Sequence, residues 1–336
     1  MIRFGIIGAG RLGKVHADSI QVLDNAKLTA VYDIAEAPAK AMQEKYGPVI
    51  CNSADELAQH PEVDAIIISS PTYCHIEGIR AGKKAGKPVF CEKPLTRLVT
   101  DGKEAADLIA ENQKPFAIGF VRRHMLKTQK AKEIINSGVL GKIRYANIDL
   151  PFGGFVRQYG DWFTDFQKSG GVIFDMLAHH VDLANWFFGK AKRVYAQSIM
   201  LDPAQELPAD YVSSTITYES GVILNLMCTW WRTGRSGECM EICGEKGSLI
   251  MTGAPDLTLH ILGQNSEVIK IDEKAASAGV NNASTGNGFV NELSNFISMV
   301  EGKKFDFMPG IEDGLRSLAV ADAMVRSAQT NQIVEL

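Results

Sequence analysis

The sequence lacks the marks of secreted, membrane-spanning and nucleic-acid-binding proteins. Its apolar start, IRFGIIGAG, is interrupted by glycines and followed by Arg11 and Lys14, so it resembles neither a signal-peptide core nor a membrane span. The formal net charge is only −4 and no long run of Lys or Arg is present, which argues against nucleic acid as a partner. We therefore expect a cytoplasmic protein that binds small molecules.

Paired cysteines are missing as well. The six cysteines are scattered through the chain without a CxxC motif, and a chain of this size needs no disulfide framework. Cys239 and Cys243 alone supply too few ligands for zinc. We expect reduced, structural cysteines and no metal.

Apolar residues are plentiful and follow two different patterns. The chain is 46% hydrophobic, and its 336 residues exceed what one core usually serves, so we expect two domains. Up to residue 120, short apolar runs alternate with helical patterns, namely FGIIG, LTAVYD, AIIIS, PVFCE and FAIGF. This rhythm predicts an α/β fold, with a doubly wound parallel sheet in a Rossmann dinucleotide-binding domain over residues 1–121.

Residues 122–336 predict a second domain, of the α+β class, for substrate binding and oligomerisation. Helical patterns cover 124–137, 171–188, 289–301 and 311–329. The segments YVSSTITYE, GVILNLMCTW and ECMEICGE alternate between apolar and polar residues and are separated by turn signals. They predict an open, largely antiparallel sheet.

A dinucleotide site is expected at the start of the chain. Gly8, Gly10 and Gly13 form GxGxxG between a predicted strand and a predicted helix, where the tight turn, the approach to pyrophosphate and the helix packing each require glycine. Asp33 ends the next strand, and an acid there binds the ribose hydroxyls and repels a 2′-phosphate. These residues favour NAD over NADP, with Arg11 and Leu12 of the same loop also expected to contact the cofactor. The alternative is a structural glycine turn followed by a surface aspartate.

A second ligand-facing edge follows the AIIIS run. Ser70, Pro71 and Thr72 lie where open α/β sheets bind ligands, so we expect them to contact the cofactor. Thr72 could instead cap the next helix. His75 is either close to the cofactor or a packing imidazole.

Glu92 and Lys93 follow the PVFC run at the same edge, where a nicotinamide would lie. Burial near a reacting hydroxyl can lower the pKa of a lysine enough for it to serve in proton transfer, and Pro94 restricts the backbone of Lys93. Most lysines are merely solvated, and that remains the alternative.

A third cluster lies in the predicted helix 171–188. Asp175, His179 and Asp182 are spaced four and three residues apart and so share one helix face, while His180 points elsewhere. A histidine flanked by carboxylates can be held in one tautomer and accept a proton from an alcohol. A core histidine beside a helix-stabilising aspartate is the alternative; a zinc site is weaker, because no third ligand is evident.

Four segments together resemble the glucose-fructose oxidoreductase / inositol dehydrogenase / rhizopine-catabolism (Gfo/Idh/MocA) family. They are GIIGAGRLG with Asp33, then SSPTYCHIEGIRAGKKAGKPVFCEKPL, GFVRRHMLKTQKAKEIINSGVLGKI and SGGVIFDMLAHHVDLANWFFG. The resemblance spans nearly the whole chain. It implies an NAD-dependent, inositol 2-dehydrogenase-like enzyme that transfers hydride from a secondary alcohol of a cyclitol or sugar.

The resemblance also implies roles for individual residues. Lys93, Asp175 and His179 match the family's catalytic lysine, aspartate and histidine, with His179 taking the hydroxyl proton, Lys93 hydrogen-bonding the substrate and Asp175 orienting them. The arginine pair matches positions at the ligand cleft, so Arg122 is expected to bind cofactor and Arg123 substrate. The family's open sheets pair face to face, which implies a homodimer or homotetramer.

The chain departs from the inositol dehydrogenases in one region. Their His-x-Asn segment before the catalytic helix is absent from IDLPFGGFVRQYGDWF, which weakens the case for inositol itself. Arg157 and Trp162 of this loop are instead expected to bind the substrate. Two other functions stay open: a dehydrogenase or reductase of another substrate, such as a dihydrodiol or keto-sugar, and a non-catalytic NAD-binding regulator.

Overall fold

The structure is a computed structural model that describes residues 1–151, 162–199, 210–230, 237–271 and 288–336. The chain forms two compact units, the first of residues 1–125 and 274–315, and the second of residues 126–273 and 316–336. The segment 274–315 thus returns to the first unit, whereas the sequence-based division assigns it to the second domain. The division into 1–121 and 122–336 stays a prediction in that form.

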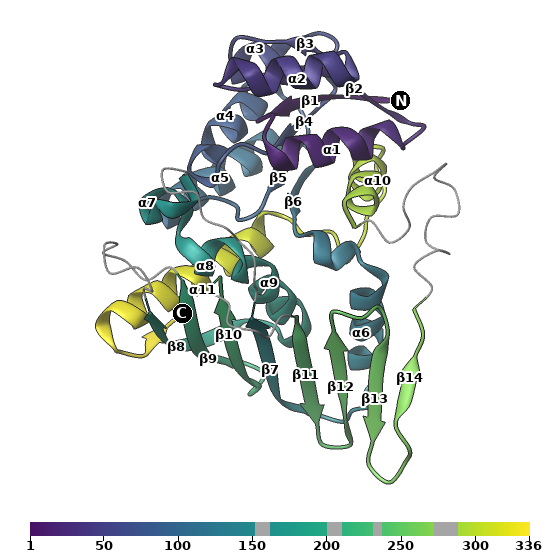
Figure 1. Cartoon of the computed structure of the whole chain (residues 1–336), viewed down its shortest axis with the longest axis vertical. Helices are drawn as coiled ribbons and strands as arrows, with labels where there is room; N and C mark the ends of the chain where they lie inside the picture. The colour runs from purple at the N-terminus through teal and green to yellow at the C-terminus, as the bar shows by residue number, and fades with distance from the viewer. Residues whose placement is uncertain (152–161, 200–209, 231–236, 272–287) are drawn as a thin grey trace. The chain divides into compact units, whose positions relative to one another are not determined.

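The first unit is built on a six-stranded parallel sheet (Figure 1). Its order, β3-β2-β1-β4-β5-β6, is that of the dinucleotide-binding fold, as predicted. The strands are β1 (Ile2–Ile7), β2 (Ala26–Tyr32), β3 (Val49–Ile50), β4 (Ala65–Ile68), β5 (Val89–Glu92) and β6 (Phe116–Gly119). Five of them correspond to the apolar runs of the sequence. β3 was not predicted, because its two residues are too few to show a hydrophobic pattern.

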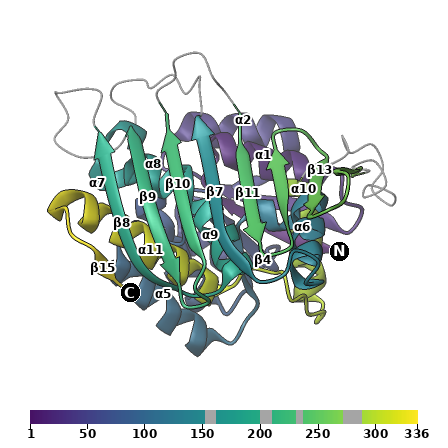
Figure 2. The ribbon, with the colours of Figure 1, turned by 90° about the horizontal axis from the view of Figure 1, so that it is seen from below.

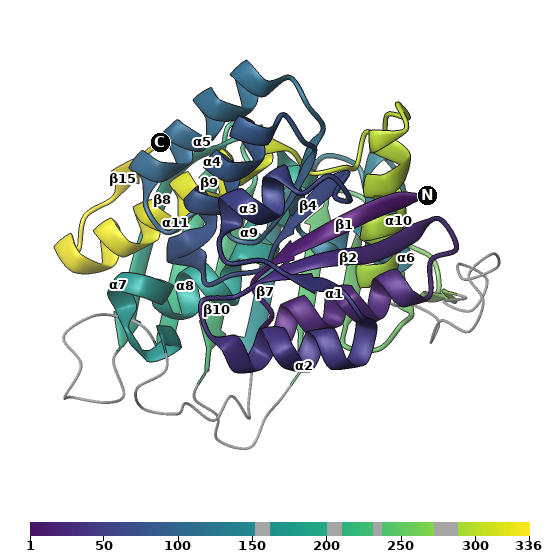
Figure 3. The same cartoon turned by 90° about the horizontal axis from the view of Figure 1, so that it is seen from above.

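Helices cover both faces of this sheet (Figure 3). They are α1 (Arg11–Gln21), α2 (Glu36–Tyr46), α3 (Ala54–Gln59), α4 (His75–Ala85), α5 (Val99–Asn112) and α10 (Gly288–Val300), with the short 3-10 helices η1 (Thr72–Cys74) and η2 (Val121–His124). Side chains of α1, α2 and α10 share one apolar core with alternate strand residues, among them Ile20, Met42 and Phe296. Helix α10 therefore belongs to the cofactor-binding fold, although it comes late in the chain.

The second unit is a nine-stranded mixed sheet with helices packed on one face (Figure 2). All its strand pairs are antiparallel except β7 with β10, in agreement with a largely antiparallel sheet. The order is β14-β13-β12-β11-β7-β10-β9-β8-β15. The strands are β7 (Ile143–Pro151), β8 (Ala191–Ile199), β9 (Tyr211–Tyr218), β10 (Ile223–Thr229), β11 (Cys239–Gly244), β12 (Gly247–Thr252), β13 (Leu257–Ile261), β14 (Glu267–Ile269) and β15 (Val334–Glu335).

The helices of the second unit are mostly those expected. They are α6 (Leu126–Asn136), α7 (Phe166–Ser169), α8 (Gly171–Asp175), α9 (Leu177–Phe188) and, from residue 316 on, α11 (Ile311–Thr330), with the 3-10 helix η3 (Trp162–Thr164). The helix predicted over 171–188 is divided at Met176 into α8 and α9. Across the described part of the chain, no helix combines the length and the apolar character that crossing a membrane would require.

Candidate functional site

The three glycines of the loop between β1 and α1 differ in the space that surrounds them. A Cβ on Gly13 would lie 2.1 Å from the carbonyl oxygen of Gly8, and one on Gly8, whose φ is +100°, would lie 2.4 Å from the Ser70 nitrogen. A Cβ on Gly10 would meet nothing within 4 Å. Gly8 and Gly13 are therefore required by the packing of the protein itself, whereas Gly10 leaves space beside the backbone for a ligand.

The same loop leaves the N-terminus of α1 ready for an anion. Gly10 is the N-cap residue and offers no side chain to the first N–H groups, and the first turn contains no acidic residue. Arg11 is exposed and Leu12 half-buried. Free N–H groups and the positive end of the helix dipole suit a pyrophosphate, so the residues present fit a bound dinucleotide.

Asp33 holds the glycine loop from the end of β2. Its Oδ2 accepts a hydrogen bond from the backbone N–H of Ala9 at 2.7 Å, and its Oδ1 accepts one from Ala35 at 2.8 Å. Each carboxylate oxygen has a second lone pair, so the side chain can still accept from a ribose hydroxyl. Ile34, next to it, is 94% exposed, an apolar surface beside the acid on which an adenine ring could rest.

The end of β4 adds a second edge to this site. The hydroxyl of Ser69 donates to the Gly8 carbonyl at 2.8 Å and ties this edge to the glycine loop. Ser70 Oγ is buried and has no hydrogen-bond partner among the described residues. Pro71 is half-buried and Thr72 is buried, and no side chain caps η1 or α4, so Thr72 is not a helix cap. An orphaned hydroxyl at a ligand-binding edge is expected where a ligand completes the hydrogen bonding.

His75 connects the ends of two strands. It is buried, with Nδ1 2.9 Å from the Pro94 carbonyl oxygen and Nε2 3.0 Å from that of Ser70. Burial lowers the pKa of this imidazole. These contacts favour the packing alternative, in which His75 ties the Ser70 edge to the segment that follows β5.

Glu92 holds the backbone of Lys93 at the end of β5. Its Oε2 accepts a hydrogen bond from the Lys93 N–H at 3.1 Å, and its Oε1 lies 2.7 Å from His16 Nε2. Gly119 of β6 makes room for the carboxylate, since a Cβ there would lie 3.1 Å from its carbon. Burial alone would raise the pKa of Glu92, but the hydrogen bond and charge of His16 outweigh it and the pKa is lowered. Lys93 is half-buried, as expected of a strand-tip residue.

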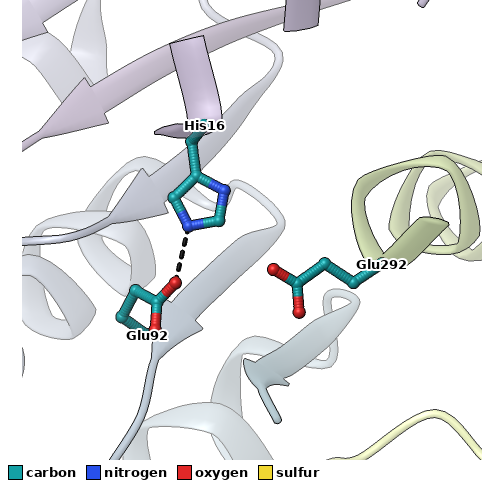
Figure 4. A group of neighbouring side chains, drawn as sticks. All are labelled: His16, Glu92 and Glu292. Atoms are coloured by element: carbon teal, nitrogen blue, oxygen red, sulfur yellow. Dashed lines mark hydrogen bonds and ion pairs between the residues drawn. The ribbon is translucent and has the colours of Figure 1, made fainter. Parts of the chain in front are cut away.

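A buried cluster of one histidine and two glutamates includes Glu92, the residue before Lys93 (Figure 4). His16 of α1, Glu92 of β5 and Glu292 of α10 are each 2% exposed or less, and their ligand-capable atoms lie within 4.8 Å of one another. Local sequence patterns do not predict this cluster. His16 stands three residues after Gly13, which places it on the inner face of α1, but no local pattern connects Glu292 to either partner.

The two arginines of η2 differ in burial. Arg122 is half-buried, whereas Arg123 is 2% exposed and pairs through Nη2 with Asp313 Oδ1 at 2.8 Å. Pairing with Asp313 compensates the burial of the Arg123 charge within the first unit. Substrate binding by Arg123 and cofactor binding by Arg122 stay predictions.

In the second unit, the predicted catalytic pair lies across the junction of two short helices. Asp175 ends α8 and His179 lies in the first turn of α9, and both are half-buried. Met176 between them keeps helical dihedral angles, φ −77° and ψ −44°, so the four-residue spacing still places the two residues on one side. Asp182, one turn further on, is 1% exposed, and so is His180, which lies 3.5 Å from Glu238.

The backbone conformation before α8 explains why residues 170 and 171 are both glycine. Both have positive φ, and a Cβ on Gly170 would lie 2.5 Å from the Phe174 ring. They permit the turn from α7 into α8.

The remaining candidates lie at the edge of the described residues. Trp162 in η3 is half-buried and stacks on Phe163, with ring centroids 3.9 Å apart. Arg157 lies outside the described residues. Substrate binding by either residue stays a prediction.

Comparison with known protein families agrees with this geometry. Residues 2–120 match the family described as oxidoreductase family, NAD-binding Rossmann fold, and residues 128–250 match the GFO/IDH/MocA C-terminal domain. The chain belongs to the GFO/IDH/MocA oxidoreductases. It is therefore an oxidoreductase whose Rossmann fold binds NAD, as predicted from Gly8, Gly10, Gly13 and Asp33.

Individual GFO/IDH/MocA relatives match over nearly the whole chain. An inositol 2-dehydrogenase of Rhizobium meliloti (strain 1021) is 28% identical over 99% of this chain and 98% of its own length. A D-glucoside 3-dehydrogenase of Escherichia coli (strain K12) is 27% identical over 100% of this chain and 97% of its own. The crystal structure of an oxidoreductase from Thermotoga maritima, 26% identical, superimposes with a TM-score of 0.85 over 99% of this chain and 98% of that one.

Proposed function

We propose that this oxidoreductase is an NAD-dependent dehydrogenase that oxidises a secondary alcohol of a cyclitol or a sugar. The observation that carries the proposal is the setting of Lys93, a half-buried lysine held by Glu92 directly beyond the carboxyl end of β5. This is the sheet edge that carries the glycine loop and Ser70, where the Rossmann fold binds its ligand. The names of the two relatives support an alcohol of a cyclitol or sugar as substrate.

The cofactor and the protein divide the chemistry. NAD supplies the hydride acceptor, and the glycine loop, Asp33 and Ser70 would hold it. In the proposal, His179 takes the hydroxyl proton, Lys93 hydrogen-bonds the alcohol oxygen and Asp175 orients His179. A positioned acid-base group of this kind contributes about 10² to 10⁴ in rate.

We also propose that the chain forms a homodimer or homotetramer through its open sheet. Tyr145 on β7 and Ile223 on β10 are register partners and are 46% and 45% exposed, an apolar pair on a strand surface. Light scattering on the purified protein tests this proposal: the mass of a dimer or tetramer supports it, and the mass of one chain refutes it.

The test of the function is a substrate panel. Polyols, inositols and sugars are incubated with NAD and the purified protein, and absorbance of the reduced nicotinamide is followed. We expect turnover with at least one cyclitol or sugar, strongly reduced in Lys93→Met and unchanged in Lys103→Met, an exposed lysine on α5. Reduction of a keto-sugar or oxidation of a dihydrodiol alone would favour a different substrate. NADH binding without any turnover would favour a regulator.

A further inference from the structure

Glu292 has no assigned part in the site, yet it is completely buried next to it. Its exposed fraction is 0%, and neither carboxylate oxygen has a hydrogen-bond partner among the described residues. Nδ1 of His16 also has no partner there. Figure 4 shows the Glu292 carboxylate directed from α10 toward the contact between His16 and Glu92.

Aromatic rings pack against His16 in this cluster. The ring of Phe90 lies 5.4 Å from that of His16, the ring of Phe289 lies 5.9 Å from it, and Phe296 contacts Phe90 on the other side. Helix α10 also packs against η2, which carries Arg122, Arg123 and His124. Arg123 is paired with Asp313, and His124 Nδ1 lies 3.0 Å from Asn295 Nδ2.

Two carboxylates in such a space cannot both be ionised at low cost. Burial, and next the charge of Glu92, raise the pKa of Glu292 well above its ordinary value. Glu92 has the opposite shift, because His16 holds it in the ionised form. Glu292 is therefore the member of the pair that keeps a proton, and a neutral carboxyl group has an O–H to donate.

The spacing suits hydrogen bonding better than metal coordination. Two ligand atoms on a tetrahedral metal lie about 3.3 Å apart, because each is about 2.0 Å from the ion. His16 Nε2 and Glu92 Oε1 are closer, at 2.7 Å, which is a hydrogen-bond distance. The 4.8 Å limit for the whole group is within reach of two successive O–H···O hydrogen bonds of about 2.7 Å each, so one water can connect the Glu292 O–H to the Glu92 carboxylate.

We propose that Glu292 is a positioning residue for Lys93: as a neutral acid it donates a hydrogen bond to a water that in turn donates to the Glu92 carboxylate, and Glu92 accepts the Lys93 N–H. His16 and Glu292 then fix Glu92 from two helices, α1 and α10, and Glu92 fixes the backbone from which the Lys93 side chain extends. The inference rests on the proposed role of Lys93 in alcohol oxidation. It gives helix α10, distant in the sequence, a part in the active site.

The test compares two replacements of Glu292 with a core control. Glu292→Gln keeps a neutral donor, so we expect kcat within about threefold of wild type; Glu292→Leu removes the donor, and we expect kcat to fall about tenfold or more while KM for NAD stays within about threefold. Phe296→Leu, one turn further along α10, lowers stability without removing the donor, and we expect kcat to stay near wild type. A loss of kcat in Glu292→Gln as large as in Glu292→Leu would overturn the proposal, as would an equal loss in Phe296→Leu.

Two readouts need no turnover. The infrared band of a protonated carboxylic acid should be present in the wild type and absent in Glu292→Gln. In protein labelled with ¹⁵N-lysine, the amide resonance of Lys93 is assigned by its loss in Lys93→Arg. This resonance should shift in Glu292→Leu and stay unchanged in Glu292→Gln. Absence of the band, an unshifted resonance, or a divalent metal retained stoichiometrically after dialysis against a chelator refutes the proposal. If no alcohol is oxidised at all, the proposed function fails, while these readouts still decide the role of Glu292.

Discussion

Asp33 Oδ2 accepts a hydrogen bond from the backbone N–H of Ala9, so the acid that we expect to select the cofactor also holds the glycine loop in place. The sequence predicts only the first of these roles. Since Oδ1 accepts from Ala35 as well, the carboxylate is held in place before any ribose arrives. A pre-positioned acid discriminates against a 2′-phosphate by charge repulsion without a cost for reorganisation.

Replacement of Asp33 should therefore change both cofactor choice and cofactor affinity. In Asp33→Ala we expect the ratio of kcat/KM for NAD to that for NADP to fall by about tenfold or more, equivalent to about 1.4 kcal/mol. Affinity for NADH should also weaken, because the Ala9 N–H loses its acceptor. Glu44→Ala, an exposed acid on α2, makes the same change in net charge and should alter neither. A wild-type protein that already prefers NADP would contradict our interpretation of Asp33.

Two glycines of the same loop should separate folding from binding. Gly13→Ala places a methyl group 2.1 Å from a backbone oxygen that cannot move aside, and we expect a loss of about 3 kcal/mol in unfolding free energy. Gly10→Ala meets open space, so we expect stability within about 1 kcal/mol of wild type. NADH binding should nevertheless be lost, since the methyl group occupies the place of the pyrophosphate. Urea unfolding and NADH fluorescence measure the two effects, and normal NADH affinity in Gly10→Ala would place the phosphates elsewhere.

Replacement of Ser70 should change stability and NADH affinity in opposite directions. Its buried hydroxyl lacks a partner among the described residues, so Ser70→Ala should leave the stability of the protein without cofactor unchanged or raise it by up to about 1 kcal/mol. If that hydroxyl binds the cofactor, NADH affinity should fall about fivefold, equivalent to about 1 kcal/mol. Thermal unfolding with and without NADH measures both. Loss of stability in the cofactor-free variant would show that Ser70 has a partner within the protein.

These tests concern features that local sequence patterns could and could not predict. The glycine loop, Asp33 and the strand tip before Lys93 were predictable because each depends on residues close together in the chain and on the known edge of a parallel sheet. β3 was missed because two residues carry no period. The partners of Glu92 were missed because α10 joins the first unit only through tertiary packing. The ion pair of Arg123 with Asp313 was missed for the same reason, and substrate binding by Arg123 stays a prediction.

The proton on Glu292 should be visible in the pH dependence of stability. A folded-state pKa raised above the unfolded value means that the native protein holds a proton which the unfolded chain releases, so stability falls as pH rises from the unfolded pKa, about 4.3, to the native pKa. The loss from this group is about 1.4 kcal/mol per pH unit in that window. Glu292→Gln has no proton to lose there. Its stability relative to the wild type should therefore rise by about 1.4 kcal/mol with each pH unit.

Urea unfolding at pH values from about 5 to about 8 measures this difference, within the window given by the direction of the Glu292 shift. Glu301→Gln, an exposed glutamate just beyond α10, should give a profile parallel to that of the wild type. Parallel profiles for Glu292→Gln and wild type would mean that Glu292 is ionised in the native protein.

Hydride transfer from the alcohol to NAD can be followed directly. A cyclitol or sugar that carries deuterium on the carbinol carbon is incubated with NAD and the protein, and NMR detects deuterium at C4 of the nicotinamide. We predict transfer by the wild type and a loss of about 10² or more in rate in both Lys93→Met and His179→Gln, with NADH binding within about threefold of wild type. Transfer at the wild-type rate in both variants, or no transfer from any cyclitol or sugar, would contradict the account.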